Sequence, residues 1–389
     1  MKHVNGSQAS AIPGAGAIGW YFTAVVCCFA LQTVAFTAIA MVLSMVLLLC
    51  HVPALTGAKG LDRVILSVVV LTTTVSLPLA AVRHPTAVAH YFIVVGTVAV
   101  AFVVTRDLAN YLRASRMVLL VAQAVIGLYL LSAGLDDYPL EKMLPGSSSN
   151  GITSYLVLLQ VNYCMALFLA ARRQAWVTPL LTLAICFVGF GRGSLLAAAA
   201  ICVINSMHFL MSSHRMRIGL FIGVAVTVLA ITLTGGWSAL WLFVESRTKL
   251  GGGFYDPARA TIIREYLQNM DLPGFFFGMG FDGTSIDTQF RGNPHNSFIR
   301  AHHIFGLPYL LVFLALPWLI FSPRRSWSAT VYLFLMFSVL VFRSATETIV
   351  FPTLLDVFFF AICFACLRDT AMRRGLPPAH QTVTSDAAQ

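Results

Sequence analysis

Long apolar runs recur along the whole chain and constrain its fold more than any other feature. The runs are about 16–20 residues long, and they lack the strict alternation with polar residues that barrel strands show. Only 10% of the 389 residues are charged, whereas a soluble domain carries about 25%. In lipid every backbone amide and carbonyl must be satisfied internally, which a helix achieves alone. The sequence therefore predicts an all-α fold, a polytopic transmembrane helical bundle.

About twelve spans are expected from these runs. Their ranges are 17–31, 33–50, 64–82, 88–105, 117–134, 154–171, 176–190, 194–211, 217–235, 304–321, 327–342 and 349–367. The stretch 17–50 fits either one long helix or two short helices that turn near Gln32 and Thr33.

The spans predict four parts of the chain. Nine spans fall within 1–235, and one large external loop with short helices covers 236–303. Three further spans fall within 304–367, and a cytoplasmic tail covers 368–389. A loop as long as 236–303 in a compact membrane protein is usually functional.

Basic residues are unevenly shared between the short connections. The richer connections hold Lys59, Arg63, Arg106, Arg113, Arg116, Arg172, Arg173, Arg215, Arg217, Arg324 and Arg325. The alternate connections hold one basic residue each: Arg83, Lys142, Arg192 and Arg343. Because connections rich in Lys and Arg face the cytoplasm, both termini are expected there, and the segments 135–153 and 236–303 are expected outside.

The net charge of +10 would suggest a nucleic-acid partner in a soluble protein. Here the charges lie in the connections, so topology explains them and no nucleic-acid partner is expected. The eight cysteines lie in apolar runs, so the large loop has no disulfide framework. Cys363 and Cys366 form a C-x-x-C inside a span and are expected to be packing residues.

Two arginine-bearing motifs fall on the expected outer face. Gly191-Arg192-Gly193-Ser194 forms a tight turn between two spans, where an arginine is costly unless it snorkels or has a task. Asp256-Pro257-Ala258-Arg259 predicts a helix start, with Asp256 as N-cap and Pro257 in the first turn. Arg259 and Arg264 then point to different faces of that helix. Only one of them is expected to face a shared site, and their spacing does not rank them.

A third motif, Asn293-Pro294-His295-Asn296-Ser297, stands just before the span near 304, and Asn296 or Ser297 is expected to cap that helix. Three histidines, His295, His302 and His303, fall close together there. A metal site is not expected from them, because no carboxylate or cysteine stands nearby and adjacent residues cannot share one helix face.

The chemistry of these groups suits a diphosphate and a proton. Arginine binds phosphate through paired, charge-assisted hydrogen bonds, so two arginines neutralise a diphosphate without a metal. A histidine takes a proton from an attacking hydroxyl. Transfer from a lipid-linked sugar diphosphate at an outer leaflet requires both a group that binds the diphosphate and a base that removes the hydroxyl proton. No metal or other cofactor is expected.

Between Trp176 and Phe321 the chain resembles the O-antigen ligase and O-antigen polymerase superfamily of bacterial inner-membrane glycosyltransferases. The resemblance rests on the Gly-Arg-Gly-Ser turn, a loop arginine opening a helix, the motifs Pro273-Gly274 and Gly278-Met279-Gly280, and His295-Asn296-Ser297-Phe298 followed by Gly306. The chain departs from the family pattern after His295, where Arg300-Ala301-His302-His303 replaces a more apolar run with an acidic residue.

The resemblance implies roles for individual residues. Arg192 and Arg259 would bind an undecaprenyl diphosphate, and His295 would be the catalytic base. The resemblance prefers Arg259 to Arg264 as the loop arginine. Further candidates for substrate contact are Arg264, Asn296, Arg300 and Arg291.

The resemblance also implies a multi-pass inner-membrane protein with a periplasmic active site. Its donor would be a lipid-linked oligosaccharide, and its acceptor lipid A–core or a growing glycan, among membrane lipids. The short segment 135–153 and the single large loop favour the ligase type over a polymerase of O-antigen or exopolysaccharide. A related cell-wall glycan polymerase is a weaker alternative.

A membrane transporter is the alternative from another class. Asp356 is the one clear acid within a span, and Glu347 and Arg343 stand nearby at its outer end. A proton-coupled role would use Asp356. The plainer expectation is that Asp356 pairs with an arginine or a backbone group inside the bundle.

Overall fold

The computed structural model describes residues 12–31, 33–133, 139–144, 148–212, 257–323 and 325–372, with scattered residues between 222 and 245. The span expected over 217–235 is described only in part, with residues 228–233 helical, and Asp256 lies outside the described residues. Throughout the described ranges the regular structure is helical.

The helices with given bounds are α1 (Ala15–Leu31), α2 (Val34–Cys50), α3 (Val52–Thr56), α4 (Gly60–Arg83), α5 (Ala87–Val104), α6 (Leu108–Ala133), α7 (Pro139–Met143), α8 (Ser149–Ala171), α9 (Val177–Val188), α10 (Arg192–Ser212), α13 (Pro257–Gln268), α14 (Leu272–Phe277), α15 (Ser285–Thr288), α16 (Ser297–Ala315), the 3-10 helix η2 (Leu316–Ile320), α17 (Trp327–Thr346) and α18 (Asp356–Met372).

Six of these segments are long and apolar enough to cross a membrane. They are α4, α5, α6, α8, α16 with η2, and α17. Four more apolar helices are shorter, namely α1, α2, α9 and most of α10. The chain is therefore a helical, multi-pass membrane protein. In the last expected range, 349–367, the helix begins only at Asp356, so residues 349–355 are not helical.

The stretch 17–50 forms two helices. Helix α1 ends at Leu31 and α2 begins at Val34, with Thr33 as an extended N-cap residue (φ −104°, ψ 142°). Of the two arrangements that the sequence left open, the pair of short helices is the one that forms.

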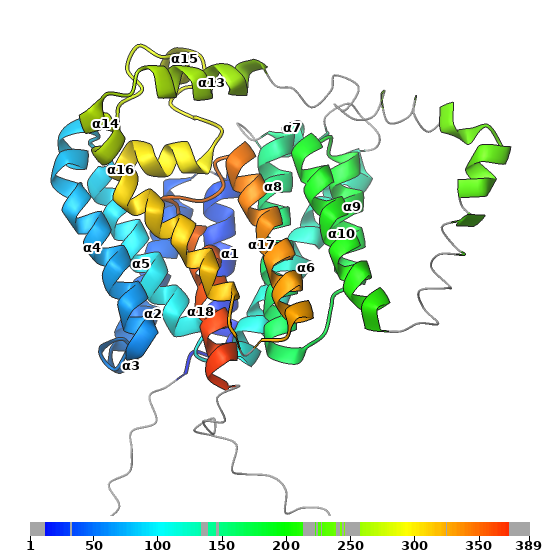
Figure 1. Cartoon of the computed structure of the whole chain (residues 1–389), viewed down its shortest axis with the longest axis horizontal. Helices are drawn as coiled ribbons and strands as arrows, with labels where there is room; N and C mark the ends of the chain where they lie inside the picture. The colour runs from blue at the N-terminus through cyan, green and yellow to red at the C-terminus, as the bar shows by residue number, and fades with distance from the viewer. Residues whose placement is uncertain are drawn as a thin grey trace, which may run out of the picture.

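The bundle has two chemically different ends. At one end Arg368 pairs with Asp62 at 2.5 Å, while Arg172 and Arg325 both pair with Asp369. We call this the basic end. At the other, the loop end, α13, α14 and α15 lie across the bundle, as Figure 1 shows, with α3 and the last turns of α18 at the basic end. Arg172 and Arg325, two of the basic residues expected on one side of the membrane, thus lie at one end.

Helix α16 begins at Ser297, earlier than the span expected near 304, so Arg300, His302 and His303 belong to the helix and not to a loop. Gly306 interrupts α16 with a φ of 72°. A Cβ at Gly306 would lie 2.3 Å from the carbonyl oxygen of Phe276 in α14. Glycine is therefore required there twice, by the backbone angle and by the close approach of α14.

Helix α8 lies in the centre of the bundle and is buried over most of its length. Two of its polar side chains bond to neighbouring helices: Gln160 accepts from Thr182 of α9 at 3.0 Å, and Asn162 accepts from Tyr111 of α6. Such interhelical hydrogen bonds hold helices together where lipid supplies no hydrophobic driving force. This packing fixes the outer turn of α8, which supports the site described next.

Candidate functional site at the loop end

The Gly-Arg-Gly-Ser turn opens α10 and packs tightly against two other helices. Ser194 is buried, and its hydroxyl accepts from Thr153 of α8 at 2.8 Å. A Cβ at Gly193 would lie 2.4 Å from the terminal guanidinium nitrogen Nη1 of Arg343 in α17. The second glycine of the motif is therefore the space through which the Arg343 side chain passes. This packing places Arg192, a half-buried side chain, beside the end of α17.

Arg343 is a buried guanidinium, 1% exposed, at this end of α17. Its Nη1 donates to the Thr346 hydroxyl at 2.8 Å, and its Nη2 donates to the Ser154 hydroxyl of α8. A buried charge is costly unless an opposite charge stands close by. That charge is the carboxylate of Glu347, one turn later in the chain.

Glu347 joins the loop to the bundle. One carboxylate oxygen, Oε1, lies 3.2 Å from Nδ1 of His295, and the other, Oε2, lies 3.8 Å from a guanidinium nitrogen of Arg259. Glu347 is 8% exposed and is the C-cap residue of α17. One carboxylate therefore holds the predicted base and the predicted loop arginine within reach of each other.

The pKa of Glu347 reflects these neighbours. Burial raises the pKa, but the hydrogen bond and charge of His295, followed by the charges of Arg343 and Arg259, lower it by more. The net pKa lies below the ordinary value of 4.5. Glu347 is therefore an anion at neutral pH and can support positive charge on the His295 ring.

The backbone around His295 is turned sharply to present the ring. His295 has a φ of 47°, and its amide donates to Oδ1 of Asn293 at 3.0 Å. The same Asn293 oxygen accepts from the Thr348 hydroxyl at 2.9 Å. Ser297 donates to the carbonyl of Glu347 at 2.9 Å. Segments 293–297 and 347–348 are thus tied side by side, which fixes the ring against the carboxylate.

Asn296 is the N-cap of α16, so of the two expected capping residues, Asn296 and Ser297, the first caps the helix. Its side-chain oxygen accepts from the amides of Phe298 at 2.9 Å and Ile299 at 3.1 Å. That oxygen is occupied by the helix terminus, so any substrate contact of Asn296 would fall to its amide nitrogen.

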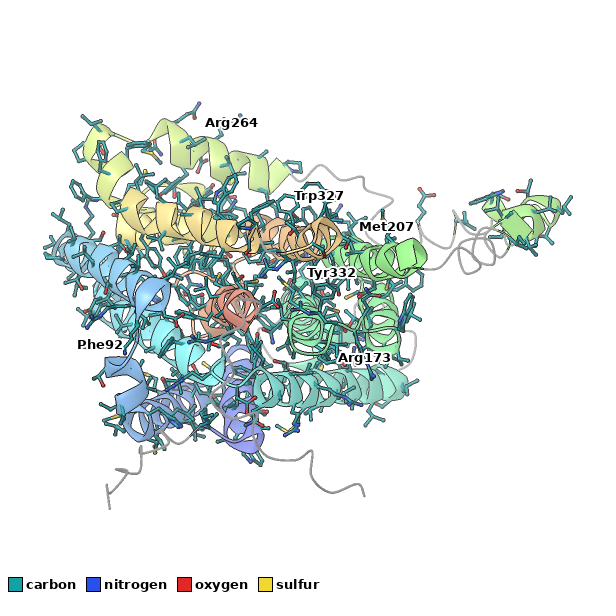
Figure 2. All side chains as sticks on the ribbon, turned by 60° about the horizontal axis from the view of Figure 1, so that its bottom comes forward. Phe92, Arg173, Met207, Arg264, Trp327 and Tyr332 are labelled. Carbon is teal, nitrogen blue, oxygen red and sulfur yellow. The ribbon has the colours of Figure 1, made fainter. Side chains whose placement is uncertain are left out.

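Helix α13 places the two loop arginines on different faces. Ile262 and Tyr266 are the buried residues of this helix, and Arg259 precedes Ile262 by one turn on the same face. The Tyr266 hydroxyl lies 2.7 Å from Nδ1 of His302, which anchors that face to α16. Arg264 is exposed, and Figure 2 shows it on the outer side of α13, directed away from the bundle. Pro257 begins α13, as expected for the first turn.

Arg291 and Arg300, the other two expected substrate contacts, lie elsewhere. Both line a pocket of about 330 Å³ on the far side of Asn293, with residues of the turn between α4 and α5. The structure therefore brings Arg259, His295 and the Arg192 turn together around Glu347 and Arg343, and it places Arg291 and Arg300 in a neighbouring cavity.

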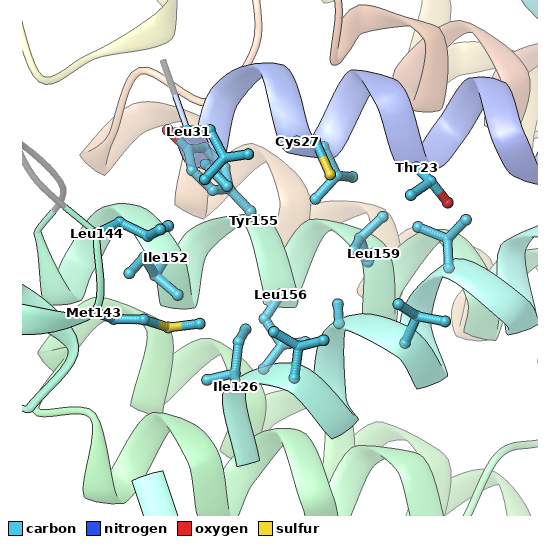
Figure 3. A pocket seen from close by; sticks show the side chains of 16 residues that line it. Thr23, Cys27, Leu31, Ile126, Met143, Leu144, Ile152, Tyr155, Leu156 and Leu159 are labelled. Carbon is cyan, nitrogen blue, oxygen red and sulfur yellow. The ribbon is translucent and has the colours of Figure 1, made fainter. Parts of the chain in front are cut away.

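An apolar cavity of about 250 Å³ lies between α1, α6, α7 and α8. Figure 3 shows Cys27 and Leu31 of α1 facing Leu156 and Leu159 of α8 across it. Tyr155, the neighbour of Ser154 in the chain, also lines it. The described residues that line the cavity carry no charge, so it suits hydrocarbon and not a polar reactant.

Sequence reasoning missed the two residues that organise the site. The sequence places Glu347 only near Asp356 of a possible transporter, and Arg343 there and among the basic residues of the short connections. Asp356 itself accepts from the amides of Phe351 at 2.6 Å and Thr353 at 3.1 Å, so the expectation of a backbone pairing is confirmed. One sequence signal points to Glu347: it is an acidic residue at the outer end of a span, on the side where the base is expected.

The arrangement can bind an anion and move a proton. Arg259 and Arg192 offer guanidinium groups, and the His295 ring, held by a carboxylate, can accept a proton. Among the residues that the structure describes, no group of three or more His, Cys, Asp or Glu side chains is placed to hold a metal ion. His302 is instead engaged by Tyr266 and by the carbonyl of Phe275 at 2.8 Å.

Comparison with known proteins adds no relative. No family model, no curated protein and no solved structure matches the chain.

Proposed function

We propose that the chain transfers a glycan from an undecaprenyl diphosphate to a sugar hydroxyl at the periplasmic face of a bacterial inner membrane. The observation that carries the proposal is the double contact of Glu347 with His295 and Arg259. A base and an anion-binding group at one membrane end are what such a transfer needs.

The proposed reaction uses each group once. The acceptor hydroxyl attacks the anomeric carbon of the donor sugar, and a new glycosidic bond forms as the bond to the diphosphate oxygen breaks. His295 takes the hydroxyl proton, and Glu347 stabilises the imidazolium that results. Arg259 and Arg192 balance the negative charge that collects on the departing diphosphate.

The geometry supports a donor that remains in the membrane. The charged cluster lies at the end of apolar helices, and an uncharged cavity borders the same outer turn of α8. The isoprenoid tail can therefore stay among apolar groups while its diphosphate reaches the arginines.

The proposed acceptor is the sugar of a lipid A–core, which is the ligase reaction. The test is to incubate the purified protein with a polyprenyl-diphosphate glycan, first with lipid A–core and then with donor alone. Transfer to the core supports the ligase. Chain growth without core would show a polymerase. If neither product formed, glycan transfer would be rejected.

The base is tested by His295→Ala, with His51→Gln as the control, because His51 precedes α3 at the other end of the bundle. His295→Ala should abolish transfer while the protein inserts and purifies normally. Near-normal transfer by His295→Ala would remove the histidine from the mechanism.

A further inference from the structure

The pocket beside the candidate site has an unusual lining. Its walls come from the α4–α5 turn, from the segment 281–294 and from α16. The ionisable side chains in them are His84, His90, Arg291, Arg300 and His303. Among the described residues that line the pocket there is no carboxylate. The cavity thus collects two guanidinium and three imidazole groups.

We propose that this pocket binds an oxyanion, a phosphate or carboxylate group, that is distinct from the donor diphosphate at Arg259. The proposal rests on the lining of the pocket and does not depend on glycan transfer. A volume of about 330 Å³ fits a small anion or a headgroup, at the lower end of the range for ligand pockets.

The basic groups of the pocket act on one another. Arg300 exerts its charge on both His90 and His303, and His84 acts on the same two rings. The ring centroids of His84 and His303 are 4.1 Å apart. Protonation of these rings would place like charges close together, and a bound anion would offset that repulsion.

The carboxylates nearest to the pocket are engaged in other contacts or stand outside it. Asp356 acts on Arg300 but is held by the backbone amides of Phe351 and Thr353. Asp282 acts on His84 and is exposed. The pocket therefore has no internal carboxylate to balance its basic groups.

Two ring nitrogens at the pocket also lack partners. Nε2 of His84 and Nδ1 of His90 are buried and have no hydrogen-bond partner among the described residues, although each ring has one backbone interaction, with His303 and with Pro352. Buried polar atoms are nearly always paired in native proteins. Burial is the largest cause that lowers the pKa of His84. An anion in the pocket would favour protonation of these rings and give them a partner.

His303 is held rigidly at the pocket wall. Its ring stacks on Phe281 with centroids 3.7 Å apart and planes at 7°, and its Nδ1 lies 2.5 Å from the carbonyl oxygen of Met279. Asn293 and Thr348 complete the wall and also support His295. A bound anion would therefore be separated from the proposed base by the side chain of Asn293.

The binding test uses inorganic phosphate and isothermal titration calorimetry. The purified full chain is held in a maltoside detergent, which carries no phosphate. Arg259→Ala is present throughout, so that phosphate does not report on the candidate catalytic arginine. Arg300→Gln should weaken phosphate binding at least about tenfold, since a hydrogen bond to a charged group contributes roughly 1.5–3 kcal/mol. Arg264→Gln, which changes an exposed arginine outside the pocket, should leave binding unchanged.

A second variant keeps the test decisive if Arg300→Gln fails to fold. Thr86 is exposed at the α4–α5 turn and lines the pocket, so Thr86→Trp should fill the cavity and abolish binding without disturbing the core. Phosphate binding that survives Thr86→Trp, or no phosphate binding in the parent at all, overturns the proposal.

The source of the anion is tested by repeating the titration in nanodiscs of phosphatidylglycerol. Binding of added phosphate that persists there, and is still lost in Thr86→Trp, indicates a soluble anion or an acidic sugar. A lipid headgroup is indicated if the parent no longer binds added phosphate in these nanodiscs. Phospholipid should then co-purify with or crosslink to the parent and not to Thr86→Trp. Either result supports the pocket.

Discussion

Replacing Glu347 by glutamine removes one negative charge and almost nothing else. Glutamine keeps the size of the side chain and one carbonyl oxygen that can accept from Nδ1 of His295. It loses the charge that stabilises an imidazolium ring and the ion pair with Arg259 at 3.8 Å. The change therefore isolates the electrostatic role of the carboxylate in the proposed proton transfer.

The size of the effect follows from the contact distance. Two unit charges 3.2 Å apart, the separation of Oε1 of Glu347 and Nδ1 of His295, interact by about 5 kcal/mol at an effective dielectric constant of about 20. The His295 side chain is 33% exposed, so solvent screens part of this energy. About 2–3 kcal/mol should remain, which corresponds to a fall in kcat of about 30- to 150-fold.

The assay measures glycan transfer by the purified protein at a fixed, saturating concentration of acceptor. Varying the lipid-linked donor gives kcat and the KM for the donor. Glu347→Gln should lower kcat and leave the donor KM equal or smaller, because Arg259 loses a competing carboxylate. Asp287→Asn is the matched control, since it removes an exposed carboxylate from the same loop. Thermal unfolding measured on each variant separates loss of rate from loss of folded protein.

An unchanged kcat in Glu347→Gln would refute the reasoning, because the charge would then have no part in proton transfer. A loss that fell equally on kcat and on the amount of folded protein would also refute it. That pattern would make Glu347 a structural partner of Arg343 alone.

Four further predictions follow from the same contacts. Arg259→Ala should weaken donor binding at least about tenfold and Arg259→Lys should restore it only in part, because lysine lacks the paired donors; Arg264→Ala should bind donor normally, and the reverse order in a donor-binding assay would contradict the assignment. Gly193→Ala should lower the unfolding midpoint and the transfer rate, because its Cβ meets Arg343; a variant as stable and active as the parent would show that the guanidinium moves aside freely. The lowered pKa of Glu347 means that its stabilisation is complete above its ordinary pKa of 4.5 and is lost as pH falls through the lowered value, so the midpoint should fall less on acidification in Glu347→Gln than in the parent. Transfer should survive a chelator; loss of activity that magnesium or manganese restores would show that a metal takes part.

The fold was largely predictable because apolar length is a local property. Runs such as 88–105 and 327–342 need no knowledge of their neighbours, and helices α5 and α17 lie over them. The start of α16 was harder to place, because Arg300, His302 and His303 look like loop residues. They become helical because α13 and α14 pack over them and give His302 its partners, Tyr266 and Phe275.

The site was predictable only in part, because its contacts join distant segments. Arg259 and His295 were named from local motifs, but Glu347 follows His295 by 52 positions and no local pattern links the two. The ranking of Arg259 over Arg264 was available in principle from the buried face of Ile262 and Tyr266. Exposed Ile263 and Leu267 obscured that face, since they are equally apolar.

The second pocket shows the same limit. His84 and His90 stand in and after the turn between two spans, and nothing in their local sequence points to Arg300. Arg83 donates to the carbonyl of Gly278, just after α14, and Gly278 packs against the backbone of His302 and His303 in α16. These contacts bring the turn to α16. Only the packed structure brings these groups into one cavity.

The most direct test of the central claim is transfer of glycan from a polyprenyl diphosphate to lipid A–core by the purified protein and its His295→Ala, Arg259→Ala and Arg192→Ala variants. The predicted result is product from the parent, none from His295→Ala, and much less from Arg259→Ala and Arg192→Ala than from the parent. No product from a well-folded parent, or full product from the three variants, would contradict the claim that this cluster is a glycan-transfer site.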